Sequence, residues 1–226
     1  MRKRIIALLY QHKALRWMLA LFHRAIGQNR FKQVRGNQIK LSTGNLYRNT
    51  FAFRNQGNSI TIGAATDLQN STITIKGANN RIVIGKNGFL NGLCIILEGN
   101  DNRVFIGDHA FVLDDTRIYV VDGSSFKMGD NCMFSDHIDI RTTDNHSIID
   151  RASGKRINYE EDVILHDKVW LCTGVRVLKG AELADGCIVG AGTVVTRKHL
   201  VPNSVVVGNP GREVSGNVDW RMERIR

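Results

Sequence analysis

A repeat of 22 residues runs through the middle of the chain and limits the folds that it can adopt. An aliphatic or methionine residue followed by glycine recurs at this spacing in four copies: Ile62-Gly63, Ile84-Gly85, Ile106-Gly107 and Met128-Gly129. The same spacing relates three further sets of positions: Leu68, Leu90, Val112 and Phe134; Thr74, Ile96, Ile118 and Ile140; and the polar Asn58, Asn80, Asn102 and Ser124. Because a fixed period of this length is typical of stacked structural units, the sequence predicts a solenoid.

After Tyr159 the period shortens to six residues. Aliphatic residues occupy seven consecutive positions of this hexad: Leu165, Leu171, Val177, Leu183, Val189, Val195 and Val201. Four residues after each of the first six stand Val169, Val175, Ala181, Cys187, Thr193 and His199. This unit suits a short strand with an inward aliphatic side chain, a small corner residue and a glycine turn, and three units close a coil of about 18 residues. The period alone leaves the handedness open, since a right-handed β-helix would stack the same residues.

The hexads of residues 165–201, followed by Val206-Val207-Gly208-Asn209-Pro210, resemble the hexapeptide-repeat acyltransferases. This resemblance covers roughly residues 58–214 and implies an all-β solenoid, a left-handed parallel β-helix. We interpret the longer coils as containing about four additional turn residues each. The expected organisation is a basic amphipathic helical segment in residues 1–30, a β-helix in residues 31–214 with an excursion loop at residues 141–163, and a C-terminal tail in residues 215–226.

The N-terminal segment has a different pattern, with mostly apolar residues three and four apart: Ile5, Leu8, His12, Leu15, Leu19, Phe22 and Ile26. This spacing predicts an α-helix of about 20 residues. The helix either packs on the β-helix or its neighbours in an oligomer, or lies on an anionic lipid surface. The longest apolar runs in this segment have six residues, so we expect neither a membrane span nor a signal peptide.

Positive charge is concentrated at the start of the chain. Residues 1–66 hold 12 Lys and Arg and no Asp or Glu, whereas residues 67–226 hold 19 basic and 21 acidic residues, so the net charge of +10 is the sum of +12 and −2. This distribution favours an acidic partner, either an acidic glycan or an anionic membrane. The four cysteines lack CxxC spacing and predict neither a zinc ribbon nor a disulfide framework. We expect a cytoplasmic protein, with peripheral contact to the inner membrane as an open alternative.

The chemistry is predicted where the repeat stops, between Arg141 and Val163. His146 lies in this segment and Trp170 follows 24 residues later. This spacing resembles that of sugar O-acetyltransferases, above all those of capsules and polysialic acid. The resemblance implies that His146 is the general base for a sugar hydroxyl, that Trp170 lines the substrate, and that Thr173 supplies an oxyanion donor. A solvated loop position for His146 and interface packing for Trp170 are the alternatives.

The resemblance also implies acetyl-CoA as the co-substrate and a homotrimer with sites between adjacent subunits. The positions expected to bind acetyl-CoA are Ala191 and Gly192 for the pantetheine arm and Thr196, Arg197, Lys198 and Arg212 for the phosphates. We expect no metal ion, because a zinc site on this fold needs a close histidine pair that His137, His146 and His166 do not form. We also expect no nucleic-acid partner.

The predicted function is therefore O-acetylation of a bacterial surface polysaccharide of acidic, sialic-acid type. Two other classes of protein remain open. One is an acetyltransferase for a small molecule such as an antibiotic, serine or a simple sugar. The other is a non-catalytic β-helix scaffold, which would bind an anionic polymer without releasing a thiol.

Overall fold

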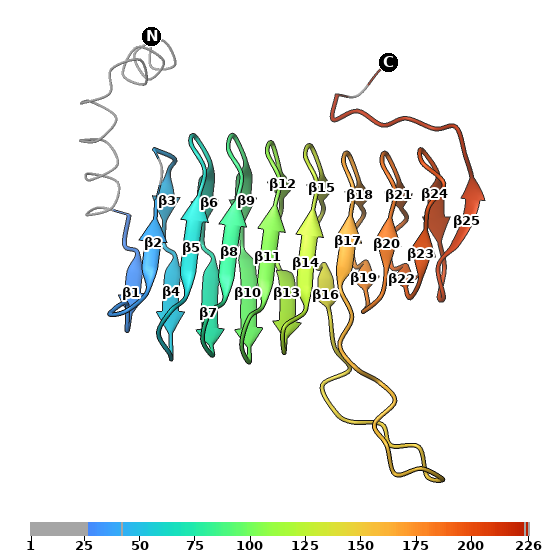
Figure 1. The fold of residues 1–226 in the computed structure, drawn as a ribbon. Coiled ribbons are helices and arrows are strands. Elements are labelled where there is room, and N and C mark those ends of the chain that lie inside the picture. The colour runs from blue at the N-terminus through green and yellow to red at the C-terminus, as the bar shows by residue number, and fades with distance from the viewer. Residues whose placement is uncertain (1–26, 42, 224, 226) are drawn as a thin grey trace.

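The computed structural model describes residues 27–41, 43–223 and 225, and folds them into a parallel β-helix of three sheets around one core (Figure 1). Sheet A contains β1 (Arg30–Lys32), β4 (Thr50–Phe53), β7 (Thr72–Lys76), β10 (Leu93–Glu98), β13 (Thr116–Val121), β16 (Asp139–Arg141), β19 (Arg176–Val177) and β22 (Val194–Val195). Sheet B contains β2 (Gln38–Lys40), β5 (Ser59–Ile62), β8 (Arg81–Ile84), β11 (Arg103–Ile106), β14 (Ser125–Met128), β17 (Val163–Leu165), β20 (Glu182–Leu183) and β23 (Lys198–His199).

Sheet C contains β3 (Leu46–Tyr47), β6 (Asp67–Gln69), β9 (Phe89–Asn91), β12 (Phe111–Val112), β15 (Met133–Phe134), β18 (Trp170–Leu171), β21 (Ile188–Val189), β24 (Val205–Val207) and β25 (Arg212–Ser215). All pairs of neighbouring strands are parallel except β24 and β25, which are antiparallel. The described residues contain no α-helix, and the predicted N-terminal helix lies outside them. No helix that could cross a bilayer is found in the part of the chain that the structure describes.

The 22-residue repeat is confirmed by the strand register. Ile84 lies between Ile62 and Ile106 on adjacent strands of sheet B, and Ile106 lies beside Met128. Glycine follows each of these residues because the coils approach closely there: a Cβ at Gly85 would lie 2.6 Å from the backbone carbon of Gly107. In the hexad region, by contrast, Gly174, Gly180, Gly186 and Gly192 adopt the left-handed turn conformation that the sequence predicts, for example Gly174 with φ of 73°.

One of the predicted sets of equivalent positions, that of Thr74, Ile96, Ile118 and Ile140, is wrong by one residue. Ile96 pairs with Thr74 as expected, but its partner on the next strand is Tyr119, while Ile118 pairs with Ile95. One extra residue between β12 and β13 shifts the register. The inward row on sheet A is therefore made of fully buried residues, namely Ile73, Ile95, Ile118 and Ile140.

The hexad prediction holds for its first six aliphatic residues, all of which are buried, and fails for Val201, which is 51% exposed. The reason is a shorter last coil: His199 rather than Val201 pairs with Leu183, only 16 residues earlier, and takes the inward position on sheet B. A buried histidine thus closes the C-terminal end of the core.

The additional residues of the longer coils lie in strands, not in turns as expected. β10 and β13 have six residues each, whereas β19 and β22 have two. Longer strands add backbone hydrogen bonds between coils while keeping the alternation of inward and outward side chains.

A ladder of buried asparagines follows the corner between sheets A and B, called the A/B corner below. The side-chain amide of Asn80 donates to Oδ1 of Asn58 at 3.0 Å, and that of Asn102 donates to Oδ1 of Asn80 at 2.8 Å. Each amide also bonds to backbone carbonyls, so these buried polar groups are satisfied. The ladder continues through Ser124, whose hydroxyl lies 2.7 Å from that of Thr142, at the point where the chain leaves the β-helix.

Candidate functional site

The chain between β16 and β17 leaves the A/B corner and projects from the solenoid as a long loop (Figure 1). Its outer part is a turn in which Oδ2 of Asp150 accepts hydrogen bonds from the backbone N–H and the hydroxyl of Ser153, at 2.7 and 2.5 Å. An isolated antiparallel bridge joins Ile149 to Arg156 below this turn. The loop is therefore internally ordered by its own polar residues.

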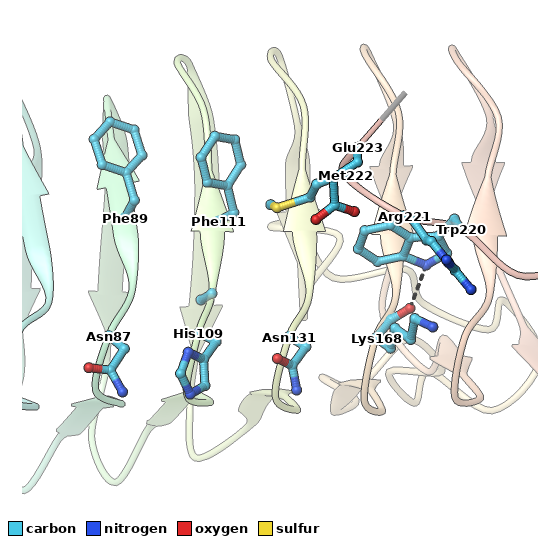
Figure 2. Close-up of a pocket in the computed structure, with 11 residues that line it drawn as sticks. Asn87, Phe89, His109, Phe111, Asn131, Lys168, Trp220, Arg221, Met222 and Glu223 are labelled. Carbon is cyan, nitrogen blue, oxygen red and sulfur yellow. Dashed lines mark hydrogen bonds between the residues drawn. The ribbon is translucent and has the colours of Figure 1, made fainter. Parts of the chain in front are cut away.

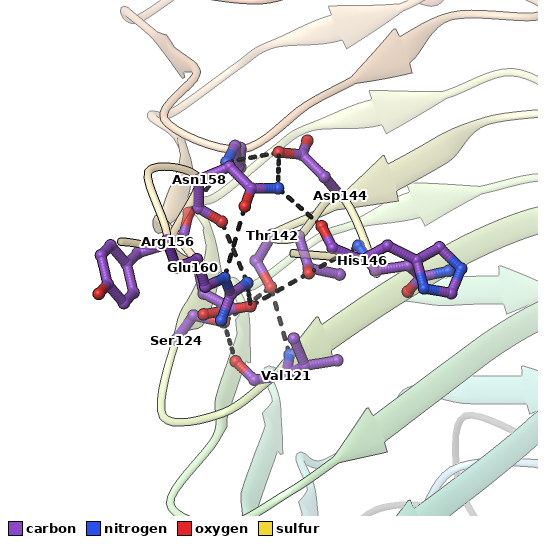
Figure 3. A network of polar contacts seen from close by, with 12 residues as sticks. Val121, Ser124, Thr142, Asp144, His146, Arg156, Asn158 and Glu160 are labelled. Carbon is purple, nitrogen blue, oxygen red and sulfur yellow. Dashed lines mark hydrogen bonds and ion pairs between the residues drawn. The ribbon is translucent and has the colours of Figure 1, made fainter. Parts of the chain in front are cut away.

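Asn158 holds the segment that carries His146 (Figure 3). Its side-chain amide donates to the backbone carbonyl oxygen of His146 at 2.8 Å and to Oδ2 of Asp144 at 2.9 Å. Its own Oδ1 accepts the backbone N–H of Ile148 at 2.6 Å. Asn158 is buried, and its one side-chain amide bonds to three residues of the segment 144–148.

Two ion pairs stabilise the base of the loop. Nζ of Lys179 lies 2.6 Å from Oδ2 of Asp144, and Nη2 of Arg156 lies 2.6 Å from Oε1 of Glu160. The hydrogen bond from Lys179, and then that from Asn158, lower the pKa of Asp144. Asp144 is therefore ionised at neutral pH and remains an acceptor for both groups.

The imidazole of His146 is exposed, and none of the described residues forms a hydrogen bond or ion pair with it. Only its backbone is fixed, through the carbonyl bond to Asn158 and through its N–H, which donates to the Asp144 carbonyl oxygen at 2.9 Å. A side chain with a fixed backbone and a free imidazole can accept a proton from an external group.

Trp170 begins β18 on sheet C, away from His146. Since the coil is triangular, sheet C lies opposite the A/B corner from which the loop of His146 leaves. The outward indole of Trp170 packs on Trp220 of the C-terminal tail, with ring centroids 5.8 Å apart, and its Nε1 lies 3.5 Å from the Ser135 hydroxyl oxygen. Within one chain, therefore, His146 and Trp170 do not lie together.

Thr173, Ala191 and Gly192 lie together at the corner between sheets C and A, called the C/A corner below. The backbone N–H of Gly192 donates to the Thr173 carbonyl oxygen at 2.9 Å. The Thr173 hydroxyl donates to Oδ1 of Asp136 at 2.5 Å, and this bond is the main cause of the lowered pKa of Asp136. Among the described residues, nothing accepts a hydrogen bond from the backbone N–H groups of Thr173 and Ala191.

The other predicted cofactor positions are divided between two places. Thr196 and Arg197 are exposed at the A/B corner, and the neighbouring Lys198 pairs with Oε2 of Glu182 at 2.8 Å. Arg212 is exposed on β25, at the end of sheet C. The predicted site residues therefore form two groups, one at the A/B corner with His146 and one on sheet C and the C/A corner with Trp170.

The remaining candidates for metal or thiol chemistry do not form a centre. No cluster of three metal-ligating side chains is present in the described part of the chain. All four cysteines are free, and burial raises the pKa of Cys132 to about 12. Sequence reasoning missed Asn158 and Trp220, because each acts through a contact formed only in the tertiary structure.

Comparison with known proteins finds acetyltransferases similar to this chain, among them two polysialic acid O-acetyltransferases. No family model matches it. It is 30% identical, over 101 residues, to a polysialic acid O-acetyltransferase of Escherichia coli O1:K1, a match that covers 45% of this chain and 33% of that protein. The chain spans less than half the length of the first curated relatives that it matches.

Two solved structures resemble most of the chain. One is the polySia-specific acetyltransferase NeuO, with a TM-score of 0.76 and 26% identity over 86% of this chain and 81% of that chain. The other is the polysialic acid O-acetyltransferase OatWY, with a TM-score of 0.74 and 27% identity over 87% of this chain and 92% of that chain.

Proposed function

Because the chain belongs to the hexapeptide-repeat acetyltransferases, whose fold is the left-handed β-helix, we propose that it transfers the acetyl group of acetyl-CoA to a hydroxyl of an acidic surface polysaccharide. The observation that carries this proposal is the similarity to two polysialic acid acetyltransferases over 86% and 87% of the chain, at TM-scores above 0.7. The exposed imidazole on an ordered loop supports it further.

In the proposed reaction His146 is the general base. Its neutral imidazole takes the proton of the sugar hydroxyl while that oxygen attacks the carbonyl carbon of the thioester. The tetrahedral intermediate then collapses, the carbon–sulfur bond breaks, and the imidazolium returns its proton to the departing thiolate. The products are the O-acetylated sugar and CoA with a free thiol.

The C/A corner supplies the groups proposed to bind acetyl-CoA. The unpaired backbone N–H of Thr173 can donate to the oxyanion of the intermediate. The unpaired N–H of Ala191, next to Gly192 on the following coil, can bond to a pantetheine amide. Among the cationic candidates, Arg197 and Arg212 have no ion-pair partner among the described residues, whereas Lys198 is already paired with Glu182.

A complete site requires two chains. The loop that carries His146 leaves the A/B corner. Trp170 lies on sheet C and Thr173 beside it, on the opposite side of the solenoid from that corner. In a homotrimer in which the A/B corner of one subunit faces sheet C of the next, His146 of one subunit would meet Trp170 and Thr173 of its neighbour at each of the three interfaces. We therefore propose that each active site lies between adjacent subunits.

Release of free thiol from acetyl-CoA in the presence of polysialic acid tests the activity. We expect His146→Ala to bind acetyl-CoA normally and to lose at least about 10²-fold in turnover, the lower range for removal of a general base. His166→Gln is the matched control, because it changes an exposed histidine that pairs with Glu182. Normal turnover in a correctly folded His146→Ala variant would refute the assignment of the base.

Co-expression of two inactive variants tests whether the site is shared. His146→Ala and Trp170→Ala chains should each be inactive alone, whereas mixed trimers should regain activity, because some interfaces then combine an intact His146 with an intact Trp170. If mixed assemblies remain as inactive as the separate variants, the two residues do not act across an interface. Small sugars, serine and aminoglycosides as acceptors in the same assay would reveal a small-molecule enzyme.

We propose that the basic N-terminal residues recruit the acidic polymer. We also propose that the protein is cytoplasmic and makes peripheral contact with an anionic membrane. Residues 1–26 carry Arg2, Lys3, Arg4, Lys13, Arg16 and Arg24. Deleting them should raise KM for long acidic chains and leave short acceptors unaffected if they bind polymer. If they bind lipid instead, the full chain should float with anionic vesicles at low salt and not at high salt, and the deleted chain should not float.

A further inference from the structure

A groove runs along the outer face of sheet C beside the C-terminal tail (Figure 2). Its volume is about 510 Å³, and its floor contains Phe89 and Phe111 from adjacent coils. The two rings are stacked, with centroids 5.5 Å apart and planes inclined by 26°. Both rings are half-buried and face outward, so they form an apolar platform on the outer face of sheet C, ending two coils before Trp170.

One wall of the groove is a row of polar side chains at the corner between sheets B and C. Asn87, His109 and Asn131 occupy equivalent positions on three successive coils and all adopt left-handed conformations, with φ of 57°, 56° and 57°. The backbone N–H of each donates to a carbonyl oxygen of the preceding coil, which fixes this row. Amide and imidazole groups therefore follow the edge of the aromatic platform at the coil spacing of about 4.8 Å.

The C-terminal tail closes the other end of the groove. The indole N–H of Trp220 donates to the Lys168 carbonyl oxygen at 2.8 Å, and Nζ of Lys168 lies 2.5 Å from Oδ1 of Asp219. Trp220 is only 8% exposed. These contacts hold Arg221 and Met222 against the groove, which they line.

We propose that this groove binds a segment of the glycan chain that is the acceptor, a step that rests on the proposed function. A sugar ring has an apolar face of C–H groups and a rim of hydroxyls. The groove offers an aromatic floor beside amide, imidazole and guanidinium donors and the Glu223 carboxylate, which can accept a hydrogen bond from a hydroxyl. Binding sites for small ligands share this combination of an apolar surface with few polar groups, and the volume lies within their usual range.

The placement of the groove favours a polymer. It extends over several coils along the solenoid axis, and Trp220 at its end packs directly on Trp170. A chain bound there would lead toward the proposed reaction centre, where a second sugar of the same chain would be acetylated. Trp220 would thus be a positioning residue for the polymer, connecting the groove to Trp170.

Binding of polysialic acid and of sialic acid trimers, measured by titration calorimetry without acetyl-CoA, tests this inference. Phe111→Ala should weaken binding of the polymer by about tenfold, the size expected for loss of one aromatic contact. Phe105→Ala is the matched control, since Phe105 faces outward from sheet B in the same coil and does not line the groove. Turnover with a single-sugar acceptor should be the same in both variants.

Equal affinity of the wild-type protein and Phe111→Ala for the polymer would overturn the proposal. Conversion of a trimer to monomers by Phe111→Ala would also overturn it, because the groove would then be an interface between copies of this chain. Failure of the proposed function would give a different result. The wild-type protein would bind the polymer and Phe111→Ala would bind it more weakly, but neither protein would release thiol from acetyl-CoA.

Discussion

The side-chain amide of Asn158 donates a hydrogen bond to the backbone carbonyl oxygen of His146, 12 residues earlier, at 2.8 Å. The two residues lie on opposite arms of the excursion loop, and the contact is buried on the side of Asn158 and exposed on the side of His146. The proposed base is thus placed by a residue that bonds to its backbone and makes no hydrogen bond to its imidazole. This separation lets the imidazole stay free for substrate while its backbone is rigid.

Replacing Asn158 should reduce catalysis without preventing binding of acetyl-CoA. Asn158→Ala leaves the carbonyl oxygen of His146 and the N–H of Ile148 without partners. This change should destabilise the ordered conformation of the loop by about 1–3 kcal/mol. We expect kcat to fall by about tenfold or more, since about 1.4 kcal/mol corresponds to a factor of ten, while KM for acetyl-CoA is unchanged. Ser147→Ala is the control, because Ser147 is exposed beside His146. An equal loss in both variants would contradict the positioning role.

The asparagine ladder should contribute to stability and not to turnover. Asn80→Ala removes an amide that both donates to Asn58 and accepts from Asn102, and leaves buried polar groups unpaired. The expected loss is about 2–3 kcal/mol in the free energy of unfolding, measured by denaturant titration. Asn79→Gly, at an exposed turn position next to the ladder, should change stability far less. A loss of activity in folded Asn80→Ala would argue for a role beyond stability.

The cysteines should be dispensable for the chemistry. Burial raises the pKa of Cys172, which lies next to Thr173, and raises that of Cys132 to about 12, so both remain thiols at neutral pH. Cys172→Ala should therefore retain most of the turnover, and mass spectrometry of the enzyme with acetyl-CoA alone should detect no acetylated cysteine. Trapping of an acetyl-enzyme on any cysteine would require a different mechanism.

His199 should make the C-terminal end of the β-helix sensitive to acid. Its Nδ1 lies 3.4 Å from Oε1 of Glu213, and its Nε2 has no hydrogen-bond partner in the described part of the chain. Burial lowers the pKa of His199 below its usual 6.5, against the opposite effect of Glu213, while the charge of Arg197 lowers it further. The unfolded chain therefore binds this proton more readily, so the contribution of His199 is complete above about pH 6.5 and declines at lower pH.

Thermal unfolding between pH 7.5 and 5.5 measures this dependence. The wild-type protein should lose stability over this interval, and hydrogen exchange should show the loss first in residues 198–215. His199→Leu should remove most of the pH dependence, because leucine can fill the inward position without titrating. Identical pH profiles of the wild-type and His199→Leu proteins would show that another group is responsible.

The periodicity of the sequence was sufficient to predict the coils, because each inward aliphatic residue and each close-packed glycine must recur once per coil. Two features escaped it. The extra residue before β13 and the shortened last coil change the register without breaking the hydrophobic pattern. Ile96 was therefore aligned with Ile118, which pairs with Ile95, and Val201 was given the inward position that His199 occupies. The repeat period does not reveal an inserted residue where two neighbouring residues, such as Ile95 and Ile96, are both aliphatic and either one fits the inward position.

The sequence by itself determined the solenoid and the position of the long loop, because local spacing decides which residues stack, and its resemblance to sugar O-acetyltransferases supplied His146 and Trp170 as candidates. Only the tertiary structure decided how those candidates are grouped. It separated His146 from Trp170, since the loop leaves the corner opposite sheet C, and it placed Trp220 on Trp170 across 50 residues of chain. Contacts between distant segments depend on how the coil closes in three dimensions, which no repeat length encodes.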